Sequence, residues 1–409
     1  MRSYRDILVS PVGAFITLAG VARLTWGIEA LALIVHVEEA ADSFAAAGLA
    51  VGALGVTSAA LAPVRGRLID RRGRAALVAM TVAVAAVIAA IALTPAAGPG
   101  ALSYVLLAGL AGIVAPPFSA WTRSGLAHRL GGQRLQLAYT VDNVFEESAF
   151  VVGPMLAGAL IAIASAGAAL VFAAALGLIA GLLLAYAHWA VVWAPPRREP
   201  EPGRGGEINR PLLLAIASLG GVGWALGCIE VAVPAFAKAE GAVATAGVAF
   251  AALSAGGVIG ALIYGARSWQ APASRRYVAL LAGLALGTAA LALPSSIAAL
   301  VAVAAVAGLA LTPAFVTNSI LIEQLSLGSP TAAAFSGTST AVNGAVAVAA
   351  PVAGVLVEGS GTDAAFLAGG AGLSLAALAA LALPSTSPSP AAGPESIAEA
   401  ATVSESRGT

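Results

Sequence analysis

Apolar segments long enough to cross a lipid bilayer follow one another along almost the whole chain. A bilayer core about 30 Å thick requires about 20 consecutive, mostly apolar residues per helical crossing. Of the 409 residues, 59% are hydrophobic and 10% are charged, against about 25% charged residues in soluble domains. The chain is therefore predicted to be an integral membrane protein. Its twelve crossings are expected at 11–36, 43–64, 75–94, 100–121, 136–163, 166–193, 211–236, 243–264, 277–293, 296–322, 331–357 and 364–383.

These crossings are predicted to be α-helices. Lipid offers the backbone no hydrogen-bond partners, so only helices and closed barrels span membranes, and the segments lack the alternating pattern of barrel strands. The predicted fold class is therefore all-α.

Positive charges gather on one side of the predicted membrane, which sets the orientation because cytoplasmic loops are enriched in Lys and Arg. The opposite loops carry acidic residues, with Lys238 as their only positive residue: Glu38, Glu39, Asp42, Glu240, Glu358 and Asp363. Both termini are predicted to be cytoplasmic. The arginines of that side are Arg2, Arg5, Arg65 to Arg74, Arg123, Arg129, Arg134, Arg197, Arg198, Arg204, Arg210, Arg267, Arg275 and Arg276.

Hydrophobicity falls sharply in two stretches. The first is the polar, Pro/Gly-rich stretch at 194–210, and the second is the tail from Pro384, whose composition favours disorder. We therefore expect an N-terminal six-helix bundle, a cytoplasmic linker, a C-terminal six-helix bundle and a disordered cytoplasmic tail, at 1–193, 194–210, 211–383 and 384–409.

The two halves are predicted to be repeats. GVARLTWGIEALAL begins at Gly20 and GVGWALGCIEVAVP at Gly221, and both place Ile-Glu at the same offset, ending at Glu29 and Glu230. Shorter matches follow in the same order, AGLAGIVAPPFSAW with AGLALTPAFVTNSI and GPMLAGAL with APVAGVL. Parallel repeats of six helices are typical of one large transporter class, with the substrate site near the bilayer midplane where the halves meet.

The stretch GRLIDRRGR at 66–74 carries the most specific motif of the chain. Gly66, Asp70, Arg71, Gly73 and Arg74 match the signature G-x-x-x-D-R-x-G-R between helices 2 and 3 of the major facilitator superfamily, which the chain resembles over nearly all its length. The resemblance implies two pseudo-symmetric six-helix bundles, and it implies that this gating loop (66–74) acts as a cytoplasmic latch for one transport state.

Physical chemistry gives each residue type of the gating loop a use. Glycine permits tight backbone geometry and close helix approach. Asp70 can accept hydrogen bonds at a helix N-terminus or pair with an arginine, and the arginines attract the anionic inner leaflet. Arginines that only set topology would explain the charge but not the spacing of the glycines and the aspartate. The second half keeps Gly265 and Arg267 at the equivalent place but lacks the aspartate.

Two further family signatures match less fully. Gly153, Pro154 and Gly158 resemble the antiporter signature of helix 5, although alanines stand at two positions where glycine is usual. Plain helix packing through small residues explains the same pattern. The helix 4 signature associated with proton coupling has an arginine inside the membrane, and here Arg123 is expected at the cytoplasmic end instead.

Ionisable residues at membrane depth are the leading site candidates. Each costs about 2.5–3.5 kcal/mol at a lipid-facing helix centre, so each is expected to face a partner or a water-filled cavity. Glu29 and Glu230 occupy matching places in the repeat and are expected to bind a cation or hold a proton. The alternative is that Arg23 neutralises Glu29, although six residues separate them. The full set is Arg23, Glu29, Asp142, Glu146, Glu147 and Glu230.

Polar and aromatic residues extend this candidate cavity. In helix 5, Tyr139, Asn143 and Glu146 share one face, Glu147 is expected near mid-membrane, and Asp142 is expected to be shallower and solvated. Helix 11 shows the same spacing, and it either lines the cavity or forms interhelical hydrogen bonds. Trp26 and Trp224 are candidates for substrate contact or for packing. The helix 11 residues are Ser336, Thr340 and Asn343.

Other classes of function find little support in the sequence. Cys228 is the only cysteine, and the three histidines are scattered, so neither a metal site nor a catalytic constellation is expected. We expect no enzyme, no cofactor and no nucleic-acid partner.

The sequence thus favours a secondary active transporter that works by alternating access and exports small amphipathic or cationic organic compounds, with the proton gradient as energy source. A sugar or metabolite permease and a sensor or scaffold without transport are the alternatives. The near absence of lysine and the abundance of alanine indicate a high-GC bacterial genome, hence a bacterial plasma (inner) membrane. We expect the protein to function as a monomer.

Overall fold

The computed structural model describes residue 7 and residues 9–94, 100–130, 132–187, 209–267, 269–325 and 331–384, and all regular structure within them is helical. The first half contains α2 (Pro11–Ala41), α3 (Phe44–Arg72), α4 (Arg74–Leu93), α5 (Ala101–Val114), α6 (Phe118–Arg129), α7 (Gly132–Ile163) and α8 (Ala166–Tyr186). The second contains α9 (Arg210–Ala239), the 3-10 helix η1 (Val243–Thr245), α10 (Ala246–Gly265), α11 (Ala273–Ala290), α12 (Ile297–Leu325), α13 (Thr331–Ser360) and α14 (Thr362–Ala380).

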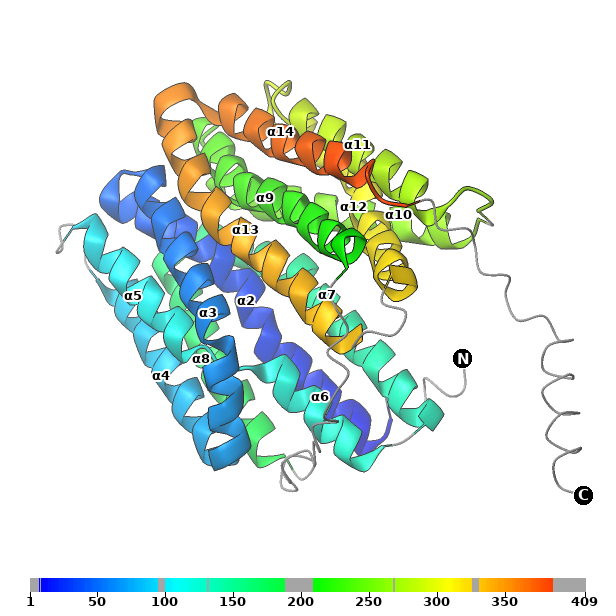
Figure 1. The fold of residues 1–409 in the computed structure, drawn as a ribbon. Helices are drawn as coiled ribbons and strands as arrows, with labels where there is room; N and C mark the ends of the chain where they lie inside the picture. The colour runs from blue at the N-terminus through cyan, green and yellow to red at the C-terminus, as the bar shows by residue number, and fades with distance from the viewer. Residues whose placement is uncertain are drawn as a thin grey trace, which may run out of the picture.

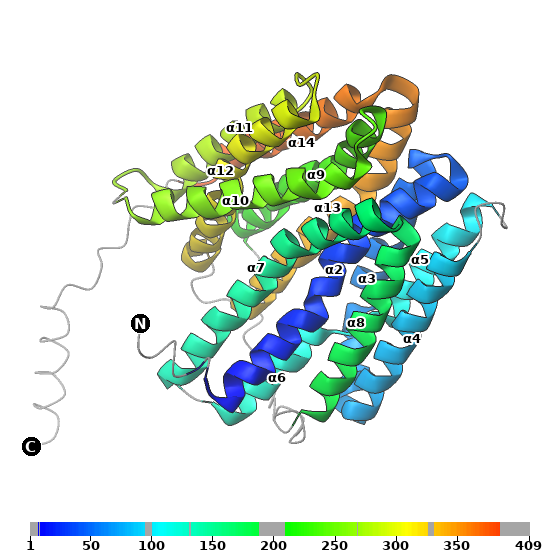
Figure 2. The same cartoon turned by 180° about the vertical axis from the view of Figure 1, so that it is seen from behind.

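The predicted all-α class with two helical bundles is confirmed (Figures 1 and 2). Together α5 and α6 make one crossing that is broken at 115–117, and among the described residues eleven helical spans are long and apolar enough to cross a membrane. The predicted crossing that is not among them is α11, whose first turn carries Arg275 and Arg276. Nearly all of the predicted linker and of the predicted tail lies outside the described residues.

Helix ends follow local sequence chemistry. Ser43 caps α3 by accepting a hydrogen bond from the Ala46 N–H at 3.0 Å, and Asn209 caps α9 by accepting from the Leu212 N–H at 2.9 Å. Pro116 and Pro117 lack the N–H groups that would continue α5, which explains the break before α6.

The two halves meet closely at one end of the molecule, where the α2–α3, α9–α10 and α13–α14 turns lie; we call it the closed end. Figure 1 shows α3 beside α13. A Cβ at Gly52 would lie 2.6 Å from the Ala347 carbonyl oxygen, so only a small residue permits this approach. The Ala45 N–H donates to Glu358 Oε1 at 3.0 Å, and Lys238 forms an ion pair with Glu38. Both contacts join one half to the other.

The gating loop differs from its prediction. The helix α3 continues through Arg72, and Gly73 is the only residue between α3 and α4, with φ at 53°, in the left-handed region that favours glycine. A Cβ at Gly66 would meet nothing within 4 Å, so the predicted close helix approach there is not made in this conformation.

Helices α2 and α7 approach so closely at Gly27 and Gly153 that a larger residue is expected to destabilise the fold. A Cβ at Gly153 would lie 2.6 Å from the Gly27 Cα. We expect Gly153→Val to lower the apparent melting temperature in detergent, since overpacking costs about 1–3 kcal/mol. Gly344→Ala is the matched control, because a Cβ there meets nothing within 4 Å. Equal melting temperatures for both variants and the wild type would contradict this packing.

Candidate functional site

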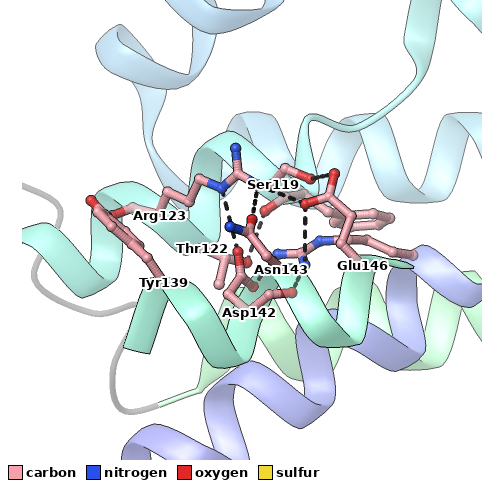
Figure 3. Close-up of polar contacts among 9 residues, drawn as sticks. Ser119, Thr122, Arg123, Tyr139, Asp142, Asn143 and Glu146 are labelled. Carbon is pink, nitrogen blue, oxygen red and sulfur yellow. Dashed lines mark hydrogen bonds and ion pairs between the residues drawn. The ribbon is translucent and has the colours of Figure 1, made fainter. Parts of the chain in front are cut away.

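A cluster of four charged side chains joins α2, α6 and α7 inside the first half (Figure 3). Its centre is the ion pair between Arg23 Nη2 and Asp142 Oδ1, at 2.7 Å, and both side chains are 0% exposed. Arg23 also lies 3.7 Å from Glu146 Oε2 through Nη1. Because buried charges are stable only when paired, this ion pair fixes α2 against α7.

Arg123 completes the cluster from α6. Its Nε lies 3.4 Å from Asp142 Oδ2, and its Nη2 donates to Glu146 Oε2 and to Asn143 Oδ1, each at 2.8 Å. Ser119 Oγ donates to Glu146 Oε1 at 3.2 Å. Each carboxylate therefore meets both arginines, and the four charges sum to zero. We call Arg23, Arg123, Asp142 and Glu146 the charge cluster.

Two sequence predictions are wrong at this cluster. Asp142 is not solvated but completely buried, and Arg123 is not in a loop but in α6, where it faces α7. Arg23 pairs with Asp142 and Glu146, which removes the alternative that it neutralises Glu29. One signal in the sequence points to a further cation: the ionisable residues predicted at membrane depth are five carboxylates and a single arginine, Arg23.

A cavity of about 550 Å³ lies beside the charge cluster, within the range of small-molecule sites. Its wall comes mostly from the first half, and the described residues of the second half that line it are Glu230, Asn343 and Val346. Alanine, leucine and valine side chains form most of this wall, with Trp26, Phe118 and Phe150 as its aromatic members. The cavity suits a molecule with an apolar body.

Glu29 and Glu230 both line this cavity and come from the matching helices α2 and α9. Each is partly buried, and within the described part of the chain neither has an ion-pair partner. Asn343 from α13 is exposed to the same cavity, and Glu146 joins the cavity to the charge cluster. The structure thus brings together residues that the sequence places in four separate helices.

Arg65 is a cavity residue that the sequence does not reveal, because its place just beyond an apolar segment predicts a loop. It lies inside α3, is 7% exposed and lines the cavity. Its Nη1 donates to the Gly112 carbonyl, and its Nη2 donates to the Ser58 carbonyl at 2.7 Å. In a continuous helix the residue at 116 would donate to Gly112, but Pro116 has no N–H. Arg65 therefore satisfies a carbonyl that the helix break leaves open.

The remaining predicted residues lie elsewhere. Trp224 Nε1 donates to the Ala368 carbonyl at 3.0 Å, so this tryptophan packs between α9 and α14 and is not part of the cavity wall. In the helix-5 motif, Gly153 faces α2, while Pro154 and Gly158 meet η1 and α10 of the other half.

The gating loop lies at the far end of α3 from the closed end. Asp70 and Arg71 are exposed in the last turn of α3, and the Arg74 guanidinium lies 4.8 Å from the centre of the Tyr186 ring. The side chains of Glu147 and Ser336 lie outside the described residues.

Comparison with known proteins agrees with this architecture. The family model of the Major Facilitator Superfamily matches residues 15–268. No curated protein sequence matches the chain.

Solved structures of transporters share the fold. The crystal structure of a point mutant of nucleoside transporter NupG superposes with a TM-score of 0.73 at 14% identity, covering 91% of this chain and 100% of that one. A POT family transporter in complex with a thioalcohol-conjugated peptide gives 0.65 at 12% identity, covering 90% and 94%. A bacterial homologue of iron transporter ferroportin, in inward-facing state, gives 0.67 at 16%, covering 93% and 98%.

The charge cluster predicts a large effect on stability. Asp142→Asn leaves Arg23 with one distant carboxylate, and losing one partner of a buried ion pair costs about 3–5 kcal/mol. We expect a clear drop in the apparent melting temperature, and a partial recovery when Arg23→Met is added, since the unpaired charge is then gone. Asp363→Asn is the control at an exposed carboxylate. A melting temperature unchanged by Asp142→Asn would contradict the role of the cluster.

Proposed function

Because the chain belongs to the Major Facilitator Superfamily, we propose that it is a secondary active transporter that exports small amphipathic or cationic organic compounds in exchange for protons. That it is a multi-pass membrane transporter and not an enzyme follows from the family and from the transporter fold. The direction, the coupling ion and the substrate class are the proposal.

The observation that carries the proposal is the pair of carboxylates in one cavity. Glu29 and Glu230 come from opposite halves, at matching places in the repeat, and no described residue neutralises them. A carboxylate in a mostly apolar cavity either holds a proton or binds a cation. In antiport the carboxylates bind a cationic substrate when the cavity is open to one side of the membrane and protons when it is open to the other. The substrate and the protons thus compete for Glu29 and Glu230.

Alternating access is supported by the packing of α3 on α13. Gly48, Gly52 and Gly55 meet α13 around Pro351, Ala350 and Ala347, in antiparallel register. The same face of α3 continues at helical spacing to Ala59, Ala62 and Gly66. Ala59 and Ala62 line the cavity, and Gly66 meets nothing.

This face explains how a second conformation would form. In the second conformation the halves separate at the closed end and approach each other at the opposite end. If α3 and α13 keep the antiparallel register of the closed end, Ala62 then lies opposite Gly337. The small residues then permit α3 and α13 to approach each other at the gating-loop end of α3 as they now do at the closed end. In this account Gly66 and the gating loop act as a latch in the second state only, which fits the open space beside Gly66 in the first.

The orientation of the molecule belongs to the proposal. The positive charge of the loops supports cytoplasmic termini, and with that orientation the closed end is external and the conformation is inward-facing. The ion pair between Lys238 and Glu38 is then an outer gate between the halves. We expect a functional monomer, because both halves that form the cavity belong to one chain.

A sugar or metabolite permease remains the second candidate. Its cavity would need many neutral hydrogen-bonding groups, whereas this wall is mostly apolar and its prominent polar groups are charged. A scaffold without transport would have no use for two unneutralised carboxylates in a cavity, since each costs about 2.5–3.5 kcal/mol in a membrane helix.

The test is proton flux in proteoliposomes that contain a pH dye, with a panel of lipophilic cations and neutral drugs added against an imposed pH gradient. The wild type is expected to move protons when a substrate is present. Glu29→Gln and Glu230→Gln are expected to reduce this flux to that of empty liposomes, because an amide cannot exchange protons. Glu240→Gln, at an exposed position at the end of α9, is the matched control. Wild-type proton flux in both Glu29→Gln and Glu230→Gln would contradict the assignment of these carboxylates as the groups that exchange protons.

A further inference from the structure

Arg65 differs from Arg23, the other buried arginine among the described residues of the first half, in having no ion pair with an acidic residue. Arg23 and Arg123 are neutralised within the charge cluster, whereas Arg65 donates only to neutral oxygens of Gly112 and Ser58. Its Nε is buried and has no hydrogen-bond partner among the described residues. Among the described residues, no acidic side chain therefore pairs with this positive charge on the cavity wall.

The start of α6 adds positive potential to the same wall. The first N–H groups of a helix have no partner within it, and its N-terminus carries about half a positive charge. No side chain caps α6 at Pro117, although the Phe118 N–H donates to the Pro116 carbonyl at 2.9 Å, and Ala115, Pro116 and Phe118 line the cavity together with Arg65. Two independent features, a guanidinium and a helix N-terminus, thus favour an anionic group at the α5–α6 break.

The uncompensated positive and negative groups lie at about the same depth. The Arg65 guanidinium reaches back to Ser58, which follows the α2–α3 turn by about 15 residues, while Glu29 precedes that turn by about 13. At 1.5 Å per residue the two levels differ by about 3 Å. Arg65 and Glu29 nevertheless form no ion pair, although both line one cavity. A space between opposite charges is left for a ligand.

We infer that the substrates are zwitterions with an apolar body, whose ammonium group binds at Glu29 and Glu230 and whose carboxylate binds at Arg65 and the start of α6. This inference rests on the proposed transport function and narrows its substrate class. The Arg65 guanidinium supplies a positive charge that attracts a carboxylate, while its Nη atoms also donate to Gly112 and Ser58. The aromatic and aliphatic wall, with Trp26, Phe150 and Leu33, receives the apolar part.

A matched set of probes tests the inference on the full-length protein in detergent. Phenylalanine carries both charges, phenylalaninamide carries only the cation, and N-acetylphenylalanine carries only the anion. We expect phenylalanine to raise the melting temperature of the wild type more than either analogue at equal concentration. Equal shifts by phenylalanine and phenylalaninamide would overturn the inference, and so would the absence of a shift with all three probes.

Variants separate recognition from a structural role of Arg65. Arg65→Gln is expected to abolish the preference for phenylalanine over phenylalaninamide and to keep the shift caused by the amide. Arg65→Lys keeps the positive charge but loses the planar guanidinium, and it is expected to retain part of the preference for phenylalanine over phenylalaninamide. This variant keeps the inference testable if Arg65→Gln does not fold. Arg134→Gln, at an exposed position in α7 outside the cavity wall, is the control and should behave as the wild type.

The outcomes distinguish this inference from the proposed function. A preference for phenylalanine that persists in Arg65→Gln would reduce Arg65 to a structural clamp on Gly112 and overturn the inference. A shift with phenylalaninamide alone would overturn it as well, while leaving export of cations in place. The proton-flux measurement on Glu29 and Glu230 decides separately on coupled transport.

Discussion

The need to neutralise charge inside a bilayer is the constraint on which the rest of this structure depends. Two arginines and two carboxylates at membrane depth satisfy it by forming a cluster with no net charge, with Arg23 and Asp142 at its buried centre. Arg123 reaches this cluster only because α6 is separated from α5 by two prolines. The break in turn leaves the Gly112 carbonyl open, and Arg65 satisfies it from α3. These linked requirements determine which side chains form the inner wall of the cavity.

The same constraint identifies the residues that are available for function. Once the charge cluster is accounted for, Glu29, Glu230 and Arg65 are the charges on the cavity wall that no described partner compensates. The cavity is asymmetric although the halves are repeats, since most of its wall belongs to the first half. The second half contributes a single carboxylate and closes the cavity at one end through the packing of α13 on α3. Movement of the second half relative to the first would therefore change access to the cavity.

Long apolar segments made the helices predictable, and the repeated Ile-Glu pair pointed to Glu29 and Glu230, which line one cavity, because these features depend on local sequence. The arginines were not predictable in the same way. The sequence predicts loops at Arg65 and Arg123, since a charge near the end of an apolar segment normally marks the membrane surface. Both lie inside helices that extend beyond the apolar segment, and their partners come from other helices. Such contacts between distant segments leave no periodic signal.

Cysteine crosslinking of α3 to α13 tests alternating access most directly. In a chain with Cys228→Ala, one pair of cysteines replaces Ala45 and Glu358 at the closed end, and another replaces Ala62 and Gly337 toward the other end. The account predicts that a short bifunctional thiol reagent links either pair but never both in one molecule, because closure of one end opens the other. Crosslinking of both pairs in the same molecule, or of the Ala45 and Glu358 pair alone during transport, would contradict it.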